Sequence, residues 1–111
     1  AAAVAGGRRV RVGAVILDLD RQTLVAADGA ESRLAAGEFE LLRLLVENPN
    51  RPLHRDWLLE TTAGNQEPEA FDRAIDLRIM RLRRKVERDP GHPEAIRTVR
   101  GVGYVFIPAS A

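Results

Sequence analysis

One long stretch of the chain carries apolar residues at the spacing of an α-helix. Ile75, Ile79, Leu82 and Val86 stand at positions i, i+4, i+7 and i+11, so a helix places all four on a single stripe. The opposite side then carries Arg73, Leu77, Met80, Arg81 and Arg84. A helix of this kind must bury its aliphatic stripe against other elements, and it turns a mostly cationic face outward.

The charges are distributed unevenly along the chain, although the formal net charge is only +1. Residues 73–100 carry nine Arg and Lys against four Asp and Glu, a local net charge of +5, and the rest of the chain carries −4. A basic region beside an acidic remainder favours a polyanionic partner that approaches in one orientation. The alternative, that this helix face is ordinary solvated surface, is equally compatible with charge alone.

Helix signals predict three helices in the middle of the chain. The first covers residues 37–47 and ends at Asn48-Pro49, and the second covers residues 55–62. A polar loop with Gly64 and Pro68 separates them from the long helix at residues 71–88, which Asp89-Pro90 ends.

Alternating apolar residues predict strands on both sides of these helices. Residues 8–35 contain about four short runs separated by turn residues, which is typical of a small antiparallel sheet. Residues 96–107 contain two runs around Arg100-Gly-Val-Gly103 and predict a hairpin. The expected fold class is therefore α+β, in the order sheet, three helices and hairpin.

Size and composition bound the remaining possibilities. A chain of 111 residues with 45% hydrophobic content supports one core, at residues 8–108, and residues 1–7 are expected to be a linker or tag remnant. Cysteine is absent, and no apolar run reaches the roughly 18 residues of a membrane span, so we expect a cytoplasmic domain.

Motifs of enzyme chemistry are missing from the sequence. His54 and His92 lack metal-ligand spacing, and neither a phosphate-binding loop nor a Gly-x-Ser-x-Gly motif is present. Gly101-Val-Gly103 lacks the third glycine of a nucleotide loop and precedes a strand. We expect no catalytic activity, no cofactor and no metal. Trp57 is expected to be a core or interface residue.

The outer face of the long helix is the strongest candidate site. It could enter a DNA major groove, which is about 12 Å wide, with Arg73 and Arg81 reaching guanine edges or phosphates. Leu77 and Met80 could contact thymine methyl groups, or they could form a protein interface. Phosphate contacts are expected on the flanks of the helix, and a minor-groove contact is expected at the hairpin turn; these residues are Arg78, Arg83, Arg84 and Arg100.

Four segments together resemble the OmpR/PhoB-type winged-helix domain, the C-terminal DNA-binding half of two-component response regulators. They are Glu38-Phe-Glu-Leu-Leu42, Arg55-Asp-Trp-Leu-Leu59, residues 72–85 followed by Asp89-Pro90, and Ile96-Arg-Thr-Val-Arg-Gly-Val-Gly-Tyr104. The resemblance covers residues 8–108 and implies a winged helix-turn-helix. Its parts would be an N-terminal sheet at 8–35, three helices within 37–89 and a wing at 96–107.

The resemblance also implies how such a domain meets DNA. The helix at 71–88 would lie in the major groove and the wing at the minor groove. The matching positions are Arg73, Leu77, Arg78, Met80 and Arg81 for the groove, Arg83 and Thr98 for phosphates, and Arg100 for the wing.

Several partners follow from the same resemblance. Two domains would bind head-to-tail on direct repeats of double-stranded DNA. A loop at residues 63–70, with Gly64, Asn65, Gln66 and Glu67, would touch RNA polymerase. A phosphoacceptor receiver domain would precede Ala1 and would take its phosphoryl group from a sensor histidine kinase.

The sequence departs from the family at two positions. Ala35-Ala36 stands where a threonine usually caps the first helix, so we expect this helix to begin without a side-chain cap, at a cost of about 1 kcal/mol. Met80 replaces a small or polar residue, so the base read at that step is not implied by the resemblance. A winged helix that binds proteins and not specific DNA remains the alternative.

Overall fold

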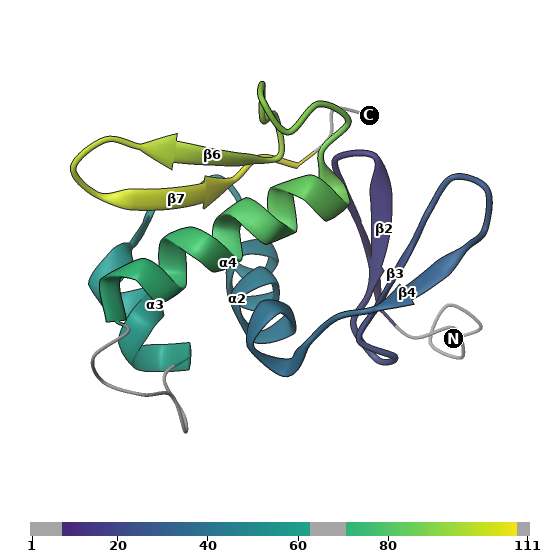
Figure 1. Cartoon of the computed structure of the whole chain (residues 1–111), viewed down its shortest axis with the longest axis horizontal. Coiled ribbons are helices and arrows are strands. Elements are labelled where there is room, and N and C mark those ends of the chain that lie inside the picture. The colour runs from purple at the N-terminus through teal and green to yellow at the C-terminus, as the bar shows by residue number, and fades with distance from the viewer. Residues whose placement is uncertain (1–7, 63–70, 109–111) are drawn as a thin grey trace.

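The computed structural model of the chain describes residues 8–62 and 71–108. Within these residues the elements are β1 (Arg9–Val12), β2 (Val15–Asp18), β3 (Thr23–Val25), β4 (Glu31–Arg33), α2 (Ala36–Glu47), β5 (Leu53–His54), α3 (Arg55–Thr62), α4 (Phe71–Val86), β6 (Ile96–Val99) and β7 (Gly103–Phe106). Figure 1 shows α4 crossing in front of α2, with the β6–β7 hairpin along one side and the N-terminal sheet near its C-terminal end. The α+β prediction, with an N-terminal antiparallel sheet, three helices and a hairpin wing, is confirmed.

The N-terminal sheet is a four-stranded antiparallel meander in the order β1-β2-β3-β4. Val12, Leu17 and Leu24 point to its buried face, as the alternation of strand residues requires. Gly13, with φ +60°, forms the turn between β1 and β2, and a Cβ atom there would lie 2.5 Å from the carbonyl oxygen of Val86. Ala14 donates its backbone N–H to that same oxygen at 2.8 Å, so the sheet satisfies one of the free carbonyls at the end of α4.

The hairpin is part of a three-stranded sheet in the order β5-β7-β6. The third strand, β5, pairs Leu53 with Tyr104 and His54 with Gly103. The sequence does not predict this strand, because two residues are too few to show alternation. This pairing ties the wing to the start of α3.

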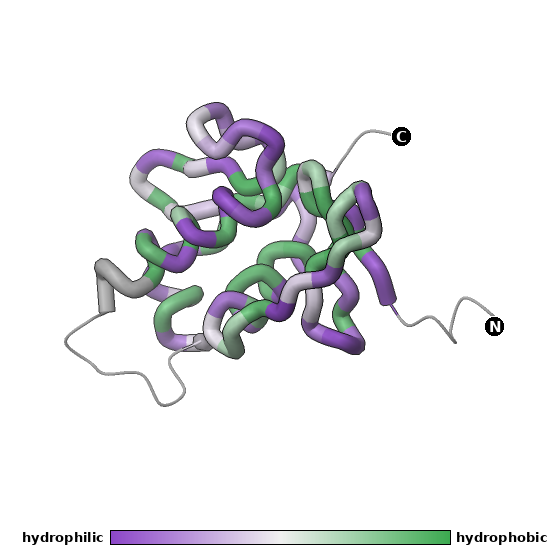
Figure 2. The backbone as a smooth tube through the Cα atoms, turned by 45° about the vertical axis from the view of Figure 1, so that its right-hand side comes forward, coloured by the Kyte–Doolittle hydropathy of each residue, from purple (hydrophilic) through white to green (hydrophobic). Residues whose placement is uncertain are grey.

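The core consists of the inward faces of the helices, packed against both sheets. The predicted stripe of α4 is buried, with Ile75, Ile79, Leu82 and Val86 all at 1% exposure or less. Leu41, Leu42 and Leu45 of α2 are fully buried beside Phe39 and Val46. In Figure 2, green hydrophobic segments alternate with purple hydrophilic ones along the helices, as expected for helices with one buried side. Each buried aliphatic side chain contributes about 1.5–3 kcal/mol to folding.

Two helix boundaries differ from the prediction. The first helix starts at Ala36, and its N-cap residue Ala35 makes no side-chain hydrogen bond, as expected. The long helix ends at Val86 and not at residue 88. Glu87, the next residue, still donates its N–H to the Arg83 carbonyl, and its buried carboxylate accepts backbone N–H bonds from Glu94, Ala95 and Ile96 at 2.8–3.1 Å. It thereby anchors the return of the chain into β6.

We predict that Gly103→Ala destabilises the domain by at least about 1–3 kcal/mol, because a Cβ atom there would overlap the Leu53 carbonyl oxygen and lie 2.9 Å from the backbone nitrogen of Arg55. Urea unfolding measures the change. Gly91→Ala is the matched control, since its Cβ would meet only the Asp89 carboxylate at 3.4 Å. Equal stability of the two variants would contradict the close approach of β5 and β7.

Glu87→Gln is expected to lower the free energy of unfolding by about 1–3 kcal/mol, since the amide nitrogen of glutamine cannot accept a backbone N–H bond. The matched control is Glu94→Gln, the same chemical change at an exposed side chain, which should leave stability within about 0.5 kcal/mol. Thermal denaturation of both variants tests this difference. A Glu87→Gln variant as stable as the control would refute the anchoring role.

Candidate nucleic-acid interface

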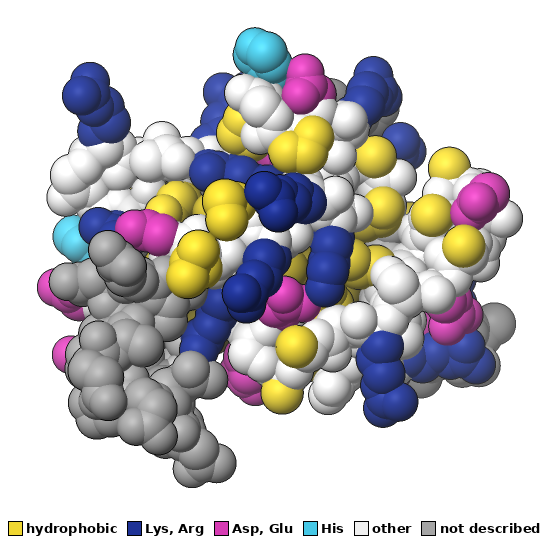
Figure 3. All heavy atoms as spheres, viewed as in Figure 1, with side chains coloured by type: hydrophobic (Ala, Val, Ile, Leu, Met, Phe, Trp, Pro, Cys, Tyr) yellow, Lys and Arg dark blue, Asp and Glu magenta, His cyan; other side chains and the backbone are white. Residues whose placement is uncertain are grey.

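The outward face of α4 presents one stripe of exposed side chains. Leu77 and Met80 are 43% and 41% exposed, and Arg81 and Arg84 are exposed beside them. These four residues stand at i, i+3, i+4 and i+7, directly opposite the buried stripe. In Figure 3, dark blue Lys and Arg side chains gather over α4 with hydrophobic side chains between them. The face therefore carries both arginine guanidinium groups and apolar side chains.

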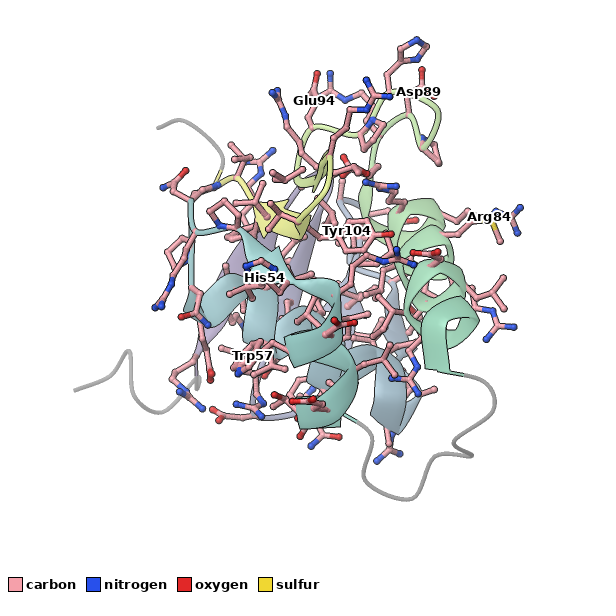
Figure 4. All side chains as sticks on the ribbon, turned by 90° about the vertical axis from the view of Figure 1, so that its left-hand side faces the viewer. His54, Trp57, Arg84, Asp89, Glu94 and Tyr104 are labelled. Carbon is pink, nitrogen blue, oxygen red and sulfur yellow. The ribbon has the colours of Figure 1, made fainter. Side chains whose placement is uncertain are left out.

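The two exposed arginines on this stripe are available to a ligand. The guanidinium groups of Arg81 and Arg84 make no hydrogen bond or ion pair with any residue that the structure describes. Figure 4 shows Arg84 pointing away from the body of the molecule. A guanidinium without a protein partner can bind the edge of a guanine or a phosphate with two parallel hydrogen bonds.

Arg78 does not belong to the exposed face, so its predicted placement toward a groove or phosphate is wrong. It is only 8% exposed, and its Nη1 donates to the Thr62 hydroxyl at 3.1 Å. Burial lowers the pKa of Arg78 from its usual value, and the charge of Glu38 opposes this change. Its spacing from Ile75 (i+3) and Leu82 (i−4) places it on the border of the buried stripe, and that spacing was the signal in the sequence.

Arg83 and Thr98 are predicted as separate phosphate contacts, but the structure brings them together. Arg83 donates from Nε and Nη2 to the Ile96 carbonyl oxygen at 3.1 and 2.9 Å, and from Nη2 to the Thr98 hydroxyl at 2.8 Å. Its guanidinium carbon also lies 5.6 Å from the centre of the Tyr104 ring. Arg83 therefore fastens α4 to β6 of the wing.

The wing ends in a tight turn that exposes Arg100. Val102 donates its N–H to the Val99 carbonyl at 2.9 Å, which closes the turn, and Arg100 has no partner among the described residues. Arg100 also lines a cleft of about 520 Å³ that separates the wing from the start of α3 and from α4. The other residues that line this cleft are His54, Arg55, Asp56, Asp76 and residues 98–104.

A carboxylate in this cleft joins three elements. Asp76 of α4 accepts hydrogen bonds from the Tyr104 hydroxyl at 2.6 Å and from Arg55 at 2.7 Å. Burial, and to a smaller extent the hydrogen bond to Asp76, raises the pKa of Tyr104 to about 12. Residue spacing alone does not bring these three residues together; the available signal was an acidic residue on a mostly cationic helix.

Other predicted residues lie elsewhere or outside the described chain. Arg73 falls within α4, but its side chain is outside the described part, and so are Gly64, Asn65, Gln66 and Glu67. Trp57, expected in the core or at an interface, is 42% exposed. It borders a hollow of about 280 Å³, which is also lined by His54 and by residues 48 and 51–53. Figure 4 shows Trp57 near His54.

Two further features are absent from residues 8–62 and 71–108. No group of three or more His, Asp or Glu side chains there could hold a metal ion. No helix in those ranges has the length and apolar character needed to cross a membrane.

Comparison with known proteins identifies the family of the chain. The family model described as "Transcriptional regulatory protein, C terminal" matches residues 29–106. The regulatory protein VirG of Agrobacterium fabrum is 47% identical over 90 residues, and VirG of Rhizobium rhizogenes is 44% identical over the same length. The match covers 81% of this chain but only 35% and 37% of those relatives, so the chain spans about a third of their length.

Solved structures share the fold. The RstA DNA-binding domain of Klebsiella pneumoniae, solved in complex with the RstA box, superposes with a TM-score of 0.72 at 27% identity, covering 92% of this chain and 99% of that one. The DNA-binding domain of CpxR from E. coli gives 0.70 at 36% identity, covering 94% and 100%. Response regulator DrrB of Thermotoga maritima, an OmpR/PhoB homologue, gives 0.76 at 34% identity over 89% of this chain and 44% of that one. The chain belongs to the C-terminal domain family of transcriptional regulatory proteins, of the OmpR/PhoB winged-helix type, which is a family of regulators and not of enzymes.

Proposed function

We propose that this domain binds double-stranded DNA sequence-specifically and regulates transcription as the C-terminal output domain of a two-component response regulator. In this proposal α4 lies in the major groove and the β6–β7 wing lies at the minor groove. One observation carries it: the exposed stripe of Leu77, Met80, Arg81 and Arg84 on a helix whose other side is buried. The related RstA domain, which was solved with its DNA box, supports the same use of this fold.

The residues of the stripe suit different parts of the DNA. Arg81 directly follows Met80, stands one turn beyond Leu77 and would read a guanine edge, while Leu77 and Met80 would pack on thymine methyl groups. Arg84, farther along the helix, would bind a phosphate.

The wing supplies contacts on the other side of the phosphate backbone. Arg100 at its tip suits a narrow minor groove, whose negative potential attracts arginine. The Thr98 hydroxyl accepts a hydrogen bond from Arg83 and keeps its own proton for a phosphate oxygen. Arg83 thus orients the Thr98 hydroxyl for a phosphate and also holds the wing.

The partners in this proposal extend beyond the DNA site. Two copies would bind direct repeats head-to-tail, and the loop with residues 64–67 would contact RNA polymerase. A receiver domain in the longer protein would be phosphorylated by a sensor histidine kinase. This chain spans about a third of the length of its VirG relatives, and a receiver domain would belong to the part of such a protein outside the match.

A protein-binding winged helix is the second candidate, and the exposure of Leu77 and Met80 favours it. The dependence of binding on salt separates the two functions. Each neutralised phosphate of B-DNA adds about −0.9 to the slope of log K against log salt, so a DNA-binding face gives a steep slope. A flat slope would support the protein-binding candidate.

Arg81→Ala is expected to weaken binding to a site selected from a random DNA pool by about 1–3 kcal/mol and to relax one base position. Arg81→Lys is the matched control for charge, because it keeps the cation and loses the fork. It should also relax specificity while leaving the salt slope near that of the wild type. Fluorescence anisotropy with matched and mismatched duplexes measures both. An unchanged base preference in Arg81→Ala would defeat the assignment.

Replacing thymine by deoxyuridine in the selected site tests the apolar residues, since only a methyl group is removed. We expect wild-type affinity to fall by about 0.8 kcal/mol at a contacted thymine. Leu77→Ala or Met80→Ala should bind both duplexes nearly equally at the position that each residue reads. If every deoxyuridine duplex binds the wild type as tightly as the thymine duplex, methyl reading is refuted.

A further inference from the structure

One acidic side chain in the described part of α4 lies at the edge of the face that is proposed to meet DNA, on the side of the wing. Asp76 is 51% exposed and immediately precedes Leu77 of the exposed stripe. A carboxylate near phosphates is repelled by them, so by charge alone this residue opposes the proposed function. A compensating role is therefore expected from its contacts.

The contacts of Asp76 use both of its carboxylate oxygens. Oδ1 accepts the Tyr104 hydroxyl hydrogen at 2.6 Å, and Oδ2 accepts Nη2–H of Arg55 at 2.7 Å. Tyr104 belongs to β7 of the wing, and Arg55 is the first residue of α3. One side chain of α4 therefore joins the wing and the neighbouring helix. Figure 4 shows Tyr104 between the hairpin and α4.

A second joint lies seven residues along the same helix. Arg83 binds the Ile96 carbonyl oxygen and the Thr98 hydroxyl of β6. At 1.5 Å of rise per residue, the two joints are about 10 Å apart along the α4 axis. Each joint holds a different strand of the hairpin, so together they add two directional contacts between α4 and the wing to the pairing of β7 with β5.

We propose that Asp76 is a positioning residue that fixes the angle of the wing to α4, and thereby the spacing between the major-groove and minor-groove contacts. This role rests on the proposed DNA binding. A wing that is already held at the correct angle loses less freedom on binding, so the joint strengthens the minor-groove contact without touching DNA.

The hydrogen bond can be tested without DNA because Tyr104 is the chain's single tyrosine. Spectrophotometric titration of tyrosinate therefore reads this group alone. Asp76→Asn should lower the pKa of Tyr104 from about 12, since a carboxylate acceptor and its charge are lost, but burial should keep it above its usual value. An unchanged pKa in Asp76→Asn would overturn the proposal.

Binding is then compared on two duplexes, a full selected site and a shortened one that ends before the minor groove facing the wing. Asp76→Asn and Tyr104→Phe should each bind the full site about threefold to tenfold more weakly than wild type, and the shortened site no more weakly. Tyr104→Phe changes no charge and keeps the buried ring. A separate unfolding curve of Tyr104→Phe tests whether this variant keeps the fold.

Asp56→Asn is the matched control for charge. Asp56 is exposed, lines the same cleft and has no partner among the described residues. Its loss should leave affinity unchanged or raise it on both duplexes, because only repulsion of phosphates is removed. If Asp76→Asn behaves in the same way, or if both joint variants weaken the two duplexes equally, the positioning role is wrong. Failure of the wild type to bind any selected site would refute the proposed function itself, while the titration would still report the hydrogen bond.

Discussion

Burial of the aliphatic stripe of α4 is the constraint on which the rest of the structure depends. With Ile75, Ile79, Leu82 and Val86 all nearly inaccessible, the helix cannot rotate about its axis without exposing them to water. The opposite stripe must therefore face outward. The same packing that stabilises the domain thus determines which side chains it presents to a ligand.

Polar contacts determine the orientation of the wing relative to the helix, which hydrophobic packing alone does not. Apolar contact is not directional, whereas the Arg83 and Asp76 hydrogen bonds are. The β1–β2 turn and Glu87 fulfil a similar role at the C-terminal end of α4, where backbone groups would otherwise lack partners. Specific bonds thus hold the helix both near its middle and at this end.

The candidate site could be predicted in part from residue spacing. Spacing correctly placed Leu77, Met80, Arg81 and Arg84 on the outer face. It misplaced Arg78, because a residue on the border of a stripe is drawn inward when Thr62 offers an acceptor for its guanidinium. It treated Arg83 and Thr98 as independent, because a contact across fifteen residues has no local signal. The role of Asp76 was missed for the same reason.

The sequence by itself determined the fold class, the buried stripe and the approximate bounds of the helices, because periodicity and helix-ending residues act locally. The tertiary structure decided the short strand β5, the end of α4 at Val86 and the pairing of arginines with the wing. These features depend on which groups from distant segments meet, and on the requirement that buried polar groups find partners. That requirement is satisfied only in three dimensions, so a linear pattern does not contain it.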